Sequence, residues 1–247
     1  MAKKQTGLTT FWVLIIVCVG LGLIFSFKMA SVSLIVEQIS KITPMFSPKD
    51  TNYQTAYYQD KIKQFAQNPG SKQDIFLVGD SLTDLGNWTE LLNKTNIKNR
   101  GIIRDTTIGV FNRIDEIIDA QPQTIFIMIG VNDLWNENRT IDEIIFTYKE
   151  ILTTLENKTP ETQIYIQSLL PINKRDYPIK IDNQDIREFN QKLEALAKEF
   201  NYEYMDIYAN FLDEFNQLKS IYTNDGVHLT AEGYKVWAKA IAQVMKE

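Results

Sequence analysis

Ile-Phe-Leu-Val-Gly-Asp-Ser-Leu-Thr-Asp, residues 75–84, joins an unbroken apolar run to a short polar turn. An apolar run without polar alternation is typical of a parallel strand that is covered on both faces. Gly79 permits a tight turn, and Ser81 follows it at the end of the predicted strand, where its hydroxyl can project beyond the sheet. Gly-Asp-Ser alone is a common turn, so whether Ser81 is catalytic has to be judged from the rest of the chain.

Similar apolar runs recur along the chain and alternate with helical patterns. We predict strands at 75–78, 125–129 and 164–170, and weaker ones at 97–100 and 204–207. The clearest helix covers 141–155, where Thr140 and Glu143 form a capping box. Further apolar stripes lie at 111–118, 186–200 and 234–241, the last with Thr230 as its N-cap. The alternation predicts an α/β fold, with a parallel sheet between two helical layers and its ligands beyond the carboxyl ends of the strands.

The N-terminal region has a different composition. Residues 7–27 contain no charged side chain, and at about 1.5 Å per residue they span the roughly 30 Å core of a bilayer. We therefore expect a cytoplasmic N-terminus at 1–6, a transmembrane anchor at 7–27, a stem at 28–50 and the folded domain at 51–247. Lys3 and Lys4 favour an N-inside orientation, which places the domain on the extracytoplasmic side of the cell membrane.

A cleaved signal peptide is the competing interpretation of residues 7–27. Cleavage requires small residues at the cleavage site, and Lys28 stands where one is expected. A lipoprotein signal would need a small residue before Cys18, and Val17 does not fit. The pattern favours an uncleaved single-pass anchor.

Composition excludes several classes of function. The chain has 247 residues, of which 44% are hydrophobic, and a net charge of −5, which argues against a nucleic-acid partner. One Cys and one His cannot form an internal disulfide or a zinc site. We expect neither a metal nor another cofactor, so any catalysis has to use ordinary side chains.

The single histidine, His228, lies in a loop just before the last predicted helix. Asp225 precedes it by three residues, so one turn can bring the carboxylate to a ring nitrogen. The other ring nitrogen could then accept the proton of a serine hydroxyl, which is weakly nucleophilic without a base. The alternative is that Asp225 and Gly226 form an ordinary turn and that His228 is a surface residue.

Two other strand ends offer hydrogen-bond donors of the kind that acyl transfer needs for its oxyanion. Gly101 follows the predicted strand at 97–100, and its N–H could approach a substrate closely. Asn132 follows the strand at 125–129 and offers a side-chain amide. Each is an ordinary turn by itself, but their order along the chain with Ser81 and His228 is hard to dismiss.

These blocks together resemble the SGNH (GDSL-type) hydrolases, in particular the platelet-activating-factor acetylhydrolase and sialate acetylesterase-like branch. The resemblance covers most of the domain through residues 79–82, Gly101, 130–133 and 225–229, and 169–171 also fits. It implies a flavodoxin-like three-layer α/β/α sandwich and hydrolysis of esters without a metal. It also implies that Ser81 is the nucleophile, His228 the base and Asp225 its orienting partner. Ser81, Gly101 and Asn132 would form the oxyanion hole.

The leading hypothesis is a membrane-anchored esterase that removes a small acyl group, such as acetyl, from a glycan or small molecule. A lysophospholipase or thioesterase is the alternative that proximity to a bilayer favours. A non-catalytic envelope binding protein is a third hypothesis, and the complete set of catalytic residues argues against it. Trp88 and Trp135 follow the Ser81 and Asn132 loops, where they either form a platform for a sugar or acyl group or pack in the core.

Overall fold

Five parallel strands form the sheet at the centre of the protein, in the order β2-β1-β3-β4-β5. In chain order they are β1 Ile75–Gly79, β2 Ile97–Gly101, β3 Thr124–Met128, β4 Gln163–Gln167 and β5 Glu203–Met205. The predicted α/β class with a parallel sheet is therefore confirmed, and the strand order is that of flavodoxin-like proteins. From β1 the chain passes to β2 on one side and then crosses back over β1 to β3 on the other side. The winding therefore reverses between the carboxyl ends of β1 and β3.

The structure is a computed structural model that describes residues 54–135 and 139–245. These residues belong to one compact unit, Thr51–Glu247. The predicted N-terminus at 1–6, anchor at 7–27 and stem at 28–50 lie outside the described residues, so they stay predictions. Among the described residues, no helix is both long and apolar enough to cross a membrane.

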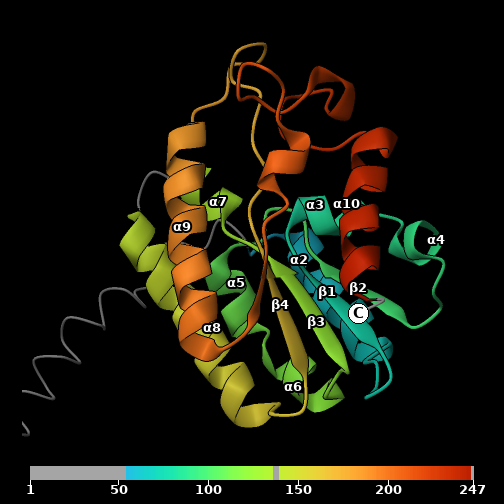
Figure 1. The fold of residues 1–247 in the computed structure, drawn as a ribbon. Helices are drawn as coiled ribbons and strands as arrows, with labels where there is room; N and C mark the ends of the chain where they lie inside the picture. Colours follow the sequence, from blue (N-terminus) through green and yellow to red (C-terminus); the bar gives the residue numbers. More distant parts are fainter. Residues whose placement is uncertain (1–53, 136–138, 246–247) are drawn as a thin grey trace, which may run out of the picture. The chain divides into compact units, whose positions relative to one another are not determined.

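Helices cover both faces of the sheet (Figure 1). On one face α5 (Thr107–Asn112), α8 (Ile141–Lys158) and α9 (Asn183–Phe200) pack together, and on the other α4 (Trp88–Leu92) packs against α10 (Ala231–Val244). The helix α2 (Ala56–Gln67) packs near β2, where the Phe65 ring lies 4.7 Å from the guanidinium of Arg100. The shorter elements are α3 (Ser81–Asp84), α6 (Asp115–Ala120), α7 (Val131–Trp135) and the 3-10 turns η1 (Tyr208–Phe211) and η2 (Ser220–Tyr222).

Burial of the strands explains why they could be predicted from apolar runs. Every residue of β1 and β3 is buried, as an unbroken apolar run between two helical layers requires. The strand predicted at 164–170 ends earlier, at Gln167. The reason lies in Asn190 of α9, whose side chain accepts from the Leu169 N–H at 2.8 Å and donates to the Leu169 carbonyl at 3.0 Å. These bonds to a side chain take the place of the sheet ladder.

Two helix starts are confirmed and one helix is divided. Thr140 and Glu143 form the predicted capping box of α8, and Thr230 caps α10. The stripe at 111–118, however, is split into α5 and α6 around Arg113, which has a non-helical φ of −113°. The buried Arg113 guanidinium donates to Asp105 Oδ2 at 2.9 Å and to the Arg100 carbonyl at 2.8 Å. An apolar period alone does not reveal such an inward-facing cation.

Candidate active site

The turn after β1 places Ser81 as the first residue of α3 at the carboxyl end of the sheet. Asp80 caps this helix, because its Oδ1 accepts from the Leu82 N–H at 3.0 Å. Gly79 has no room for a side chain, since a Cβ there would lie 2.4 Å from the Met128 carbonyl oxygen of β3. The turn is therefore packed directly against the neighbouring strand, and Ser81 is only 8% exposed.

His228 reaches this turn from the loop before α10. Its Nε2 lies 3.0 Å from Ser81 Oγ, and its Nδ1 lies 2.6 Å from Asp225 Oδ2. The second oxygen of Asp225 accepts from the backbone N–H groups of Val227 and His228 at 2.9 and 2.8 Å. The structure thus brings together the three residues that the sequence singled out. The arrangement also favours the tautomer with a proton on Nδ1, which leaves Nε2 free to accept from the serine hydroxyl.

The Asp225 carboxylate is held in its charged form. Partial burial opposes the charge, but hydrogen bonds from the His228 ring and from the Val227 and His228 N–H groups outweigh it and lower the pKa of Asp225. Thr223 completes the turn, because its Oγ1 accepts from the N–H groups of Asp225 and Gly226 at 3.3 and 2.8 Å. The local turn thereby holds Asp225 against the ring.

Of the two further donors that the sequence predicts for an oxyanion, only Asn132 has a donor group available. Asn132, at the start of α7, donates one amide hydrogen to the Asp105 carbonyl at 2.9 Å, which leaves its second amide hydrogen for a ligand. The Gly101 N–H, in contrast, donates to Asn99 Oδ1 at 2.9 Å. A Cβ at Gly101 would lie 2.2 Å from the Asp84 backbone nitrogen, so this glycine allows α3 to pack on β2. The prediction that Gly101 supplies an oxyanion donor is thus corrected.

The turn that follows Gly101 offers a donor instead. The Asp105 N–H donates to the Ile102 carbonyl at 3.0 Å, which closes a four-residue turn, and the third residue, Arg104, has a φ of +67°. This is the geometry of a type II turn, whose third position favours glycine. Within the described part of the chain, neither the Arg104 N–H nor the Ser81 N–H has a hydrogen-bond partner. The sequence did not predict this turn, because arginine has no preference for a positive φ.

Asp84, at the end of α3, joins this helix to two other segments. Its Oδ1 accepts from Lys61 of α2 at 2.7 Å. Its Oδ2 accepts from the Tyr57 hydroxyl at 2.7 Å and from the Ile103 N–H at 3.2 Å. From the other side of α3, the Tyr234 hydroxyl of α10 donates to the Leu82 carbonyl at 2.8 Å. The short helix that carries Ser81 is thereby held by α2, α10 and the turn at residues 102–105.

Three buried carboxyl groups, Asp80, Asp105 and Asp133, interact with one another beside the turn that carries Ser81. Asp105 pairs with Arg113 at 2.9 Å and Asp133 with Arg139 at 2.5 Å. Asp80 has no cation, and among the described residues its buried Oδ2 has no hydrogen-bond partner. Burial, followed by the charges of Asp105 and Asp133, raises the pKa of Asp80 to about 7 although the Leu82 N–H opposes the shift.

The two tryptophans near the site have different roles. Trp88 is 2% exposed, donates its ring N–H to the Thr83 carbonyl at 2.7 Å and packs edge-on against Trp237, with ring centroids 4.7 Å apart. Trp135 is 37% exposed at the end of α7. Trp88 therefore packs in the core, and of the two tryptophans only Trp135 is accessible to a ligand.

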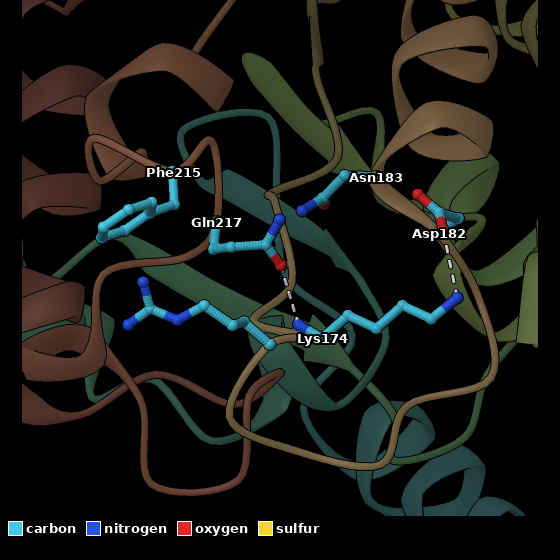
Figure 2. Close-up of a pocket in the computed structure, with 6 residues that line it drawn as sticks. Lys174, Asp182, Asn183, Phe215 and Gln217 are labelled. Carbon is cyan, nitrogen blue, oxygen red and sulfur yellow. Dashed lines mark hydrogen bonds and ion pairs between the residues drawn. The ribbon is translucent and has the colours of Figure 1, made fainter.

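A cavity of about 280 Å³ lies beside the loop after β4 and does not include Ser81, Asp225 or His228 (Figure 2). Its charged side chains are paired, because Lys174 Nζ lies 3.0 Å from Asp182 Oδ2 and Arg175 Nε lies 3.1 Å from Asp176 Oδ1. The wall of the cavity is completed by Asn183, Phe215 and Gln217. Among the described residues, no group of three His, Cys, Asp or Glu side chains could hold a metal ion.

Comparisons with known proteins give one matching family model and several similar proteins. The model of the GDSL-like lipase/acylhydrolase family matches residues 77–236. The rat platelet-activating factor acetylhydrolase IB subunit alpha2 is 27% identical over 70% of this chain and 76% of its own. A structure described as a putative platelet activating factor from Streptococcus pneumoniae has a TM-score of 0.71 at 24% identity, covering 76% of this chain and 92% of its own. A catalytic mutant of an acetylxylan esterase from Geobacillus stearothermophilus has a TM-score of 0.59 at 20% identity, over 70% and 94%. At these identities the two structures show a shared fold.

Proposed function

Because this chain belongs to the GDSL-like lipase/acylhydrolase family and is an ester-hydrolysing enzyme, we propose that it removes small acyl groups with Ser81, His228 and Asp225. The observation that carries the proposal is the continuous series of contacts from Ser81 Oγ to His228 Nε2 at 3.0 Å and from His228 Nδ1 to Asp225 Oδ2 at 2.6 Å. A hydroxyl, an imidazole and a carboxylate in this order are what nucleophilic acyl transfer requires.

In the first half of the reaction, His228 Nε2 takes the proton of Ser81 as its Oγ attacks the ester carbonyl. Asp225 stabilises the imidazolium that forms. The Ser81 N–H, the Arg104 N–H and the second amide hydrogen of Asn132 donate to the developing oxyanion. Each donor of this kind contributes about 2.7–4 kcal/mol to lowering the barrier. The imidazolium then protonates the leaving alkoxide, and the acyl group stays on Ser81.

In the second half, a water molecule takes the place of the alcohol. His228 removes a proton from this water as it attacks the acyl-enzyme carbonyl, and the same three donors stabilise the second oxyanion. Collapse of the intermediate breaks the bond to Ser81 Oγ, which regains its proton from His228. The products are a carboxylic acid and a free alcohol, and no group other than water is consumed.

Acetyl esters of glycans or of small molecules are the substrates that we propose. Two of the similar proteins carry names that specify acetyl removal, from platelet-activating factor and from acetylated xylan. The side chains of His228 and Asp225 are 42% and 52% exposed, so a bulky alcohol could reach the base without passing through a closed tunnel. An open base of this kind suits a polymer that carries small acyl groups.

A lipolytic activity is the second candidate, and two exposed apolar side chains favour it. Leu85 directly follows α3 and is 55% exposed, and Trp135 ends α7 at 37% exposed. The helix α3 begins with Ser81, and Asn132 is the second residue of α7. Leu85 and Trp135 could therefore line the path of a longer acyl chain. The anchor proposed for residues 7–27 would hold the enzyme at the membrane, with the domain on the extracytoplasmic side.

The test is a series of 4-nitrophenyl esters from acetate to palmitate, hydrolysed by the purified protein and by Ser81→Ala. We expect kcat/KM to be highest for acetate and to fall steadily from butyrate onward. A maximum at octanoate or longer would favour the lipolytic candidate. Hydrolysis that Ser81→Ala leaves intact would contradict the mechanism for both candidates. Protease treatment of intact cells, with detection of the domain after residue 50, tests the proposed topology.

A further inference from the structure

Arg104 occupies a backbone conformation that glycine would adopt more easily. Its φ of +67° lies at the third position of the turn closed by the Ile102 carbonyl and the Asp105 N–H. A side chain at a positive φ strains the backbone, and residues held in that state cluster at ligand-binding and catalytic sites. An arginine at this position is therefore an outlier that calls for an explanation.

The flanking residues prevent the turn from relaxing. The Ile103 N–H donates to Asp84 Oδ2 at 3.2 Å, and the Asp105 carbonyl accepts from Asn132 Nδ2 at 2.9 Å. Asp84 closes the helix that begins with Ser81, and Asn132 carries the side-chain amide proposed for the oxyanion. Arg104 is thus held between the two segments that would contact a reacting ester, at the carboxyl edge of β1 and β3.

The charge of Arg104 is uncommitted, which distinguishes it from the cations around it. Lys61 pairs with Asp84 at 2.7 Å, and the buried Arg113 and Arg139 pair with Asp105 and Asp133. The basic residues of the cavity in Figure 2 are paired as well. Arg104 is exposed, and within the described part of the chain its guanidinium has no hydrogen bond and no ion pair.

We propose that the Arg104 side chain binds an anionic group, a carboxylate or a phosphate, that the ester substrate carries close to its scissile bond. This inference rests on the proposed function and names the substrate class of that site. The chain has a net charge of −5, and Asp225 is held ionised beside His228, so both would repel an anionic substrate. A cation at this edge would offset that repulsion. A guanidinium presents paired N–H groups that match either anion.

The experiment compares matched ester pairs on the full-length protein. The first pair is an O-acetylated methyl glucuronide and the corresponding methyl glucoside, which differ by one carboxylate. The second is 1-acetylglycerol 3-phosphate and 1-acetylglycerol, which differ by one phosphate. We expect kcat/KM to be at least tenfold higher for the anionic member of at least one pair, mainly through a lower KM. The pair that shows the preference identifies the anion.

Three variants assign that preference to Arg104. Arg104→Gly suits the positive φ and removes the charge, so the anionic-to-neutral ratio of kcat/KM should fall at least tenfold. Arg104→Lys keeps the charge without the paired N–H groups, so the ratio should take an intermediate value. Arg175→Gln removes one positive charge at the cavity of Figure 2 and should leave the ratio unchanged. Raising the salt concentration should increase the KM of the anionic ester for the wild type and much less for Arg104→Gly.

The outcomes separate this inference from the proposed function. Hydrolysis of the neutral esters that depends on Ser81, with no preference for either anion, would overturn the role of Arg104 and leave the esterase mechanism standing. A preference that Arg104→Gly retains would also overturn it. If Ser81→Ala hydrolyses all four esters as fast as the wild type, the proposed mechanism fails first.

Discussion

The proposed nucleophile and its base are held in place by two different kinds of structure. Ser81 is 8% exposed, follows a strand whose every residue is buried, and sits in a turn packed against β3. The side chains of His228 and Asp225 are 42% and 52% exposed, and hydrogen bonds within a single loop hold them together. The nucleophile side thus depends on the packing of the whole sheet, and the base side depends on one turn. Changes on the first side should affect both stability and activity, whereas changes on the second should affect activity alone.

Removal of the two reacting groups is the strongest test of this contrast. Ser81→Ala and His228→Ala should each lower kcat by a factor of about 10⁴–10⁶, because either loss disables the same unit. A fluorophosphonate probe should label the wild type and fail to label Ser81→Ala. Tm should change little in His228→Ala, since the ring is exposed. Ser220→Ala, an exposed serine elsewhere, serves as the control and should keep both labelling and activity.

Asp225→Asn tests the loop alone and should have the next largest effect. The amide keeps an oxygen for the Val227 and His228 N–H groups but no longer stabilises the imidazolium, so kcat should fall by about 10³–10⁴. The pKa of Asp225 is lowered in the folded protein, so its stabilising contribution is complete above its ordinary pKa and is lost as the pH falls through the lowered value. Because the Asp225 side chain is 52% exposed, this contribution is small, and the Tm of the variant at pH 7 should lie only slightly below that of the wild type. A large loss of stability would show that the loop supports the fold.

Gly101→Ala tests the packed side. The added methyl group would lie 2.2 Å from the Asp84 backbone nitrogen, so α3 must shift away from β2. We expect a loss of about 3 kcal/mol in the free energy of unfolding, measured in urea, together with a drop in activity. If Gly101 served only to offer its N–H to an oxyanion, alanine would retain that group and the protein would stay as stable as the wild type.

Asp80→Asn should have the smallest effect and concerns the buried carboxyl groups. Burial raises the pKa of Asp80 to about 7, so the folded protein binds this proton more tightly than the unfolded chain does. The free energy of unfolding should therefore fall as the pH rises from about 4 to about 7. Asparagine can still cap α3 through the Leu82 N–H, and it removes the charge. At pH 8 the variant should be more stable by on the order of 2 kcal/mol, and the two curves should converge near pH 4.

Parallel stability curves for Asp80→Asn and the wild type would contradict this interpretation. Glu116, whose side chain is 17% exposed and pairs with both Arg100 and Arg113, provides a comparison through Glu116→Gln. That substitution removes a carboxylate from a paired group. It should lower stability rather than raise it at neutral pH, because the buried Arg100 and Arg113 would lose a partner, whereas Asp80 has no cation to lose.

The sequence predicted the parts of this protein that depend on local pattern. Buried strands appear as unbroken apolar runs, and Thr140 with Glu143 marks the start of α8. His228 could be singled out because the chain has one histidine, and the spacing from Asp225 implies contact within one turn. These features need no knowledge of distant residues.

The parts that the sequence did not predict depend on long-range contacts. Gly101 looked like a site for a close approach, and it is one, but the approaching group is the backbone of α3. The left-handed turn at Arg104 exists because Asp84 and Asn132 hold its neighbours from both sides. Asp84 itself appears in the sequence as one more acidic residue after a turn. Its three partners lie 19 to 27 residues away along the chain.

The position of α2 has a practical consequence for anyone who wishes to trim this protein. The family match begins at residue 77, yet α2 lies before it and binds α3, the helix that carries Ser81, through Tyr57 and Lys61. The Tyr58 hydroxyl also donates to the Gly109 carbonyl at 2.8 Å in α5. A chain shortened to the family boundary would leave the Asp84 side chain, which is 5% exposed, without its lysine, and would remove the contact of α2 with α5. A truncated enzyme for crystallisation or screening should therefore begin no later than residue 54, ahead of the helix that a domain boundary drawn from homology would discard.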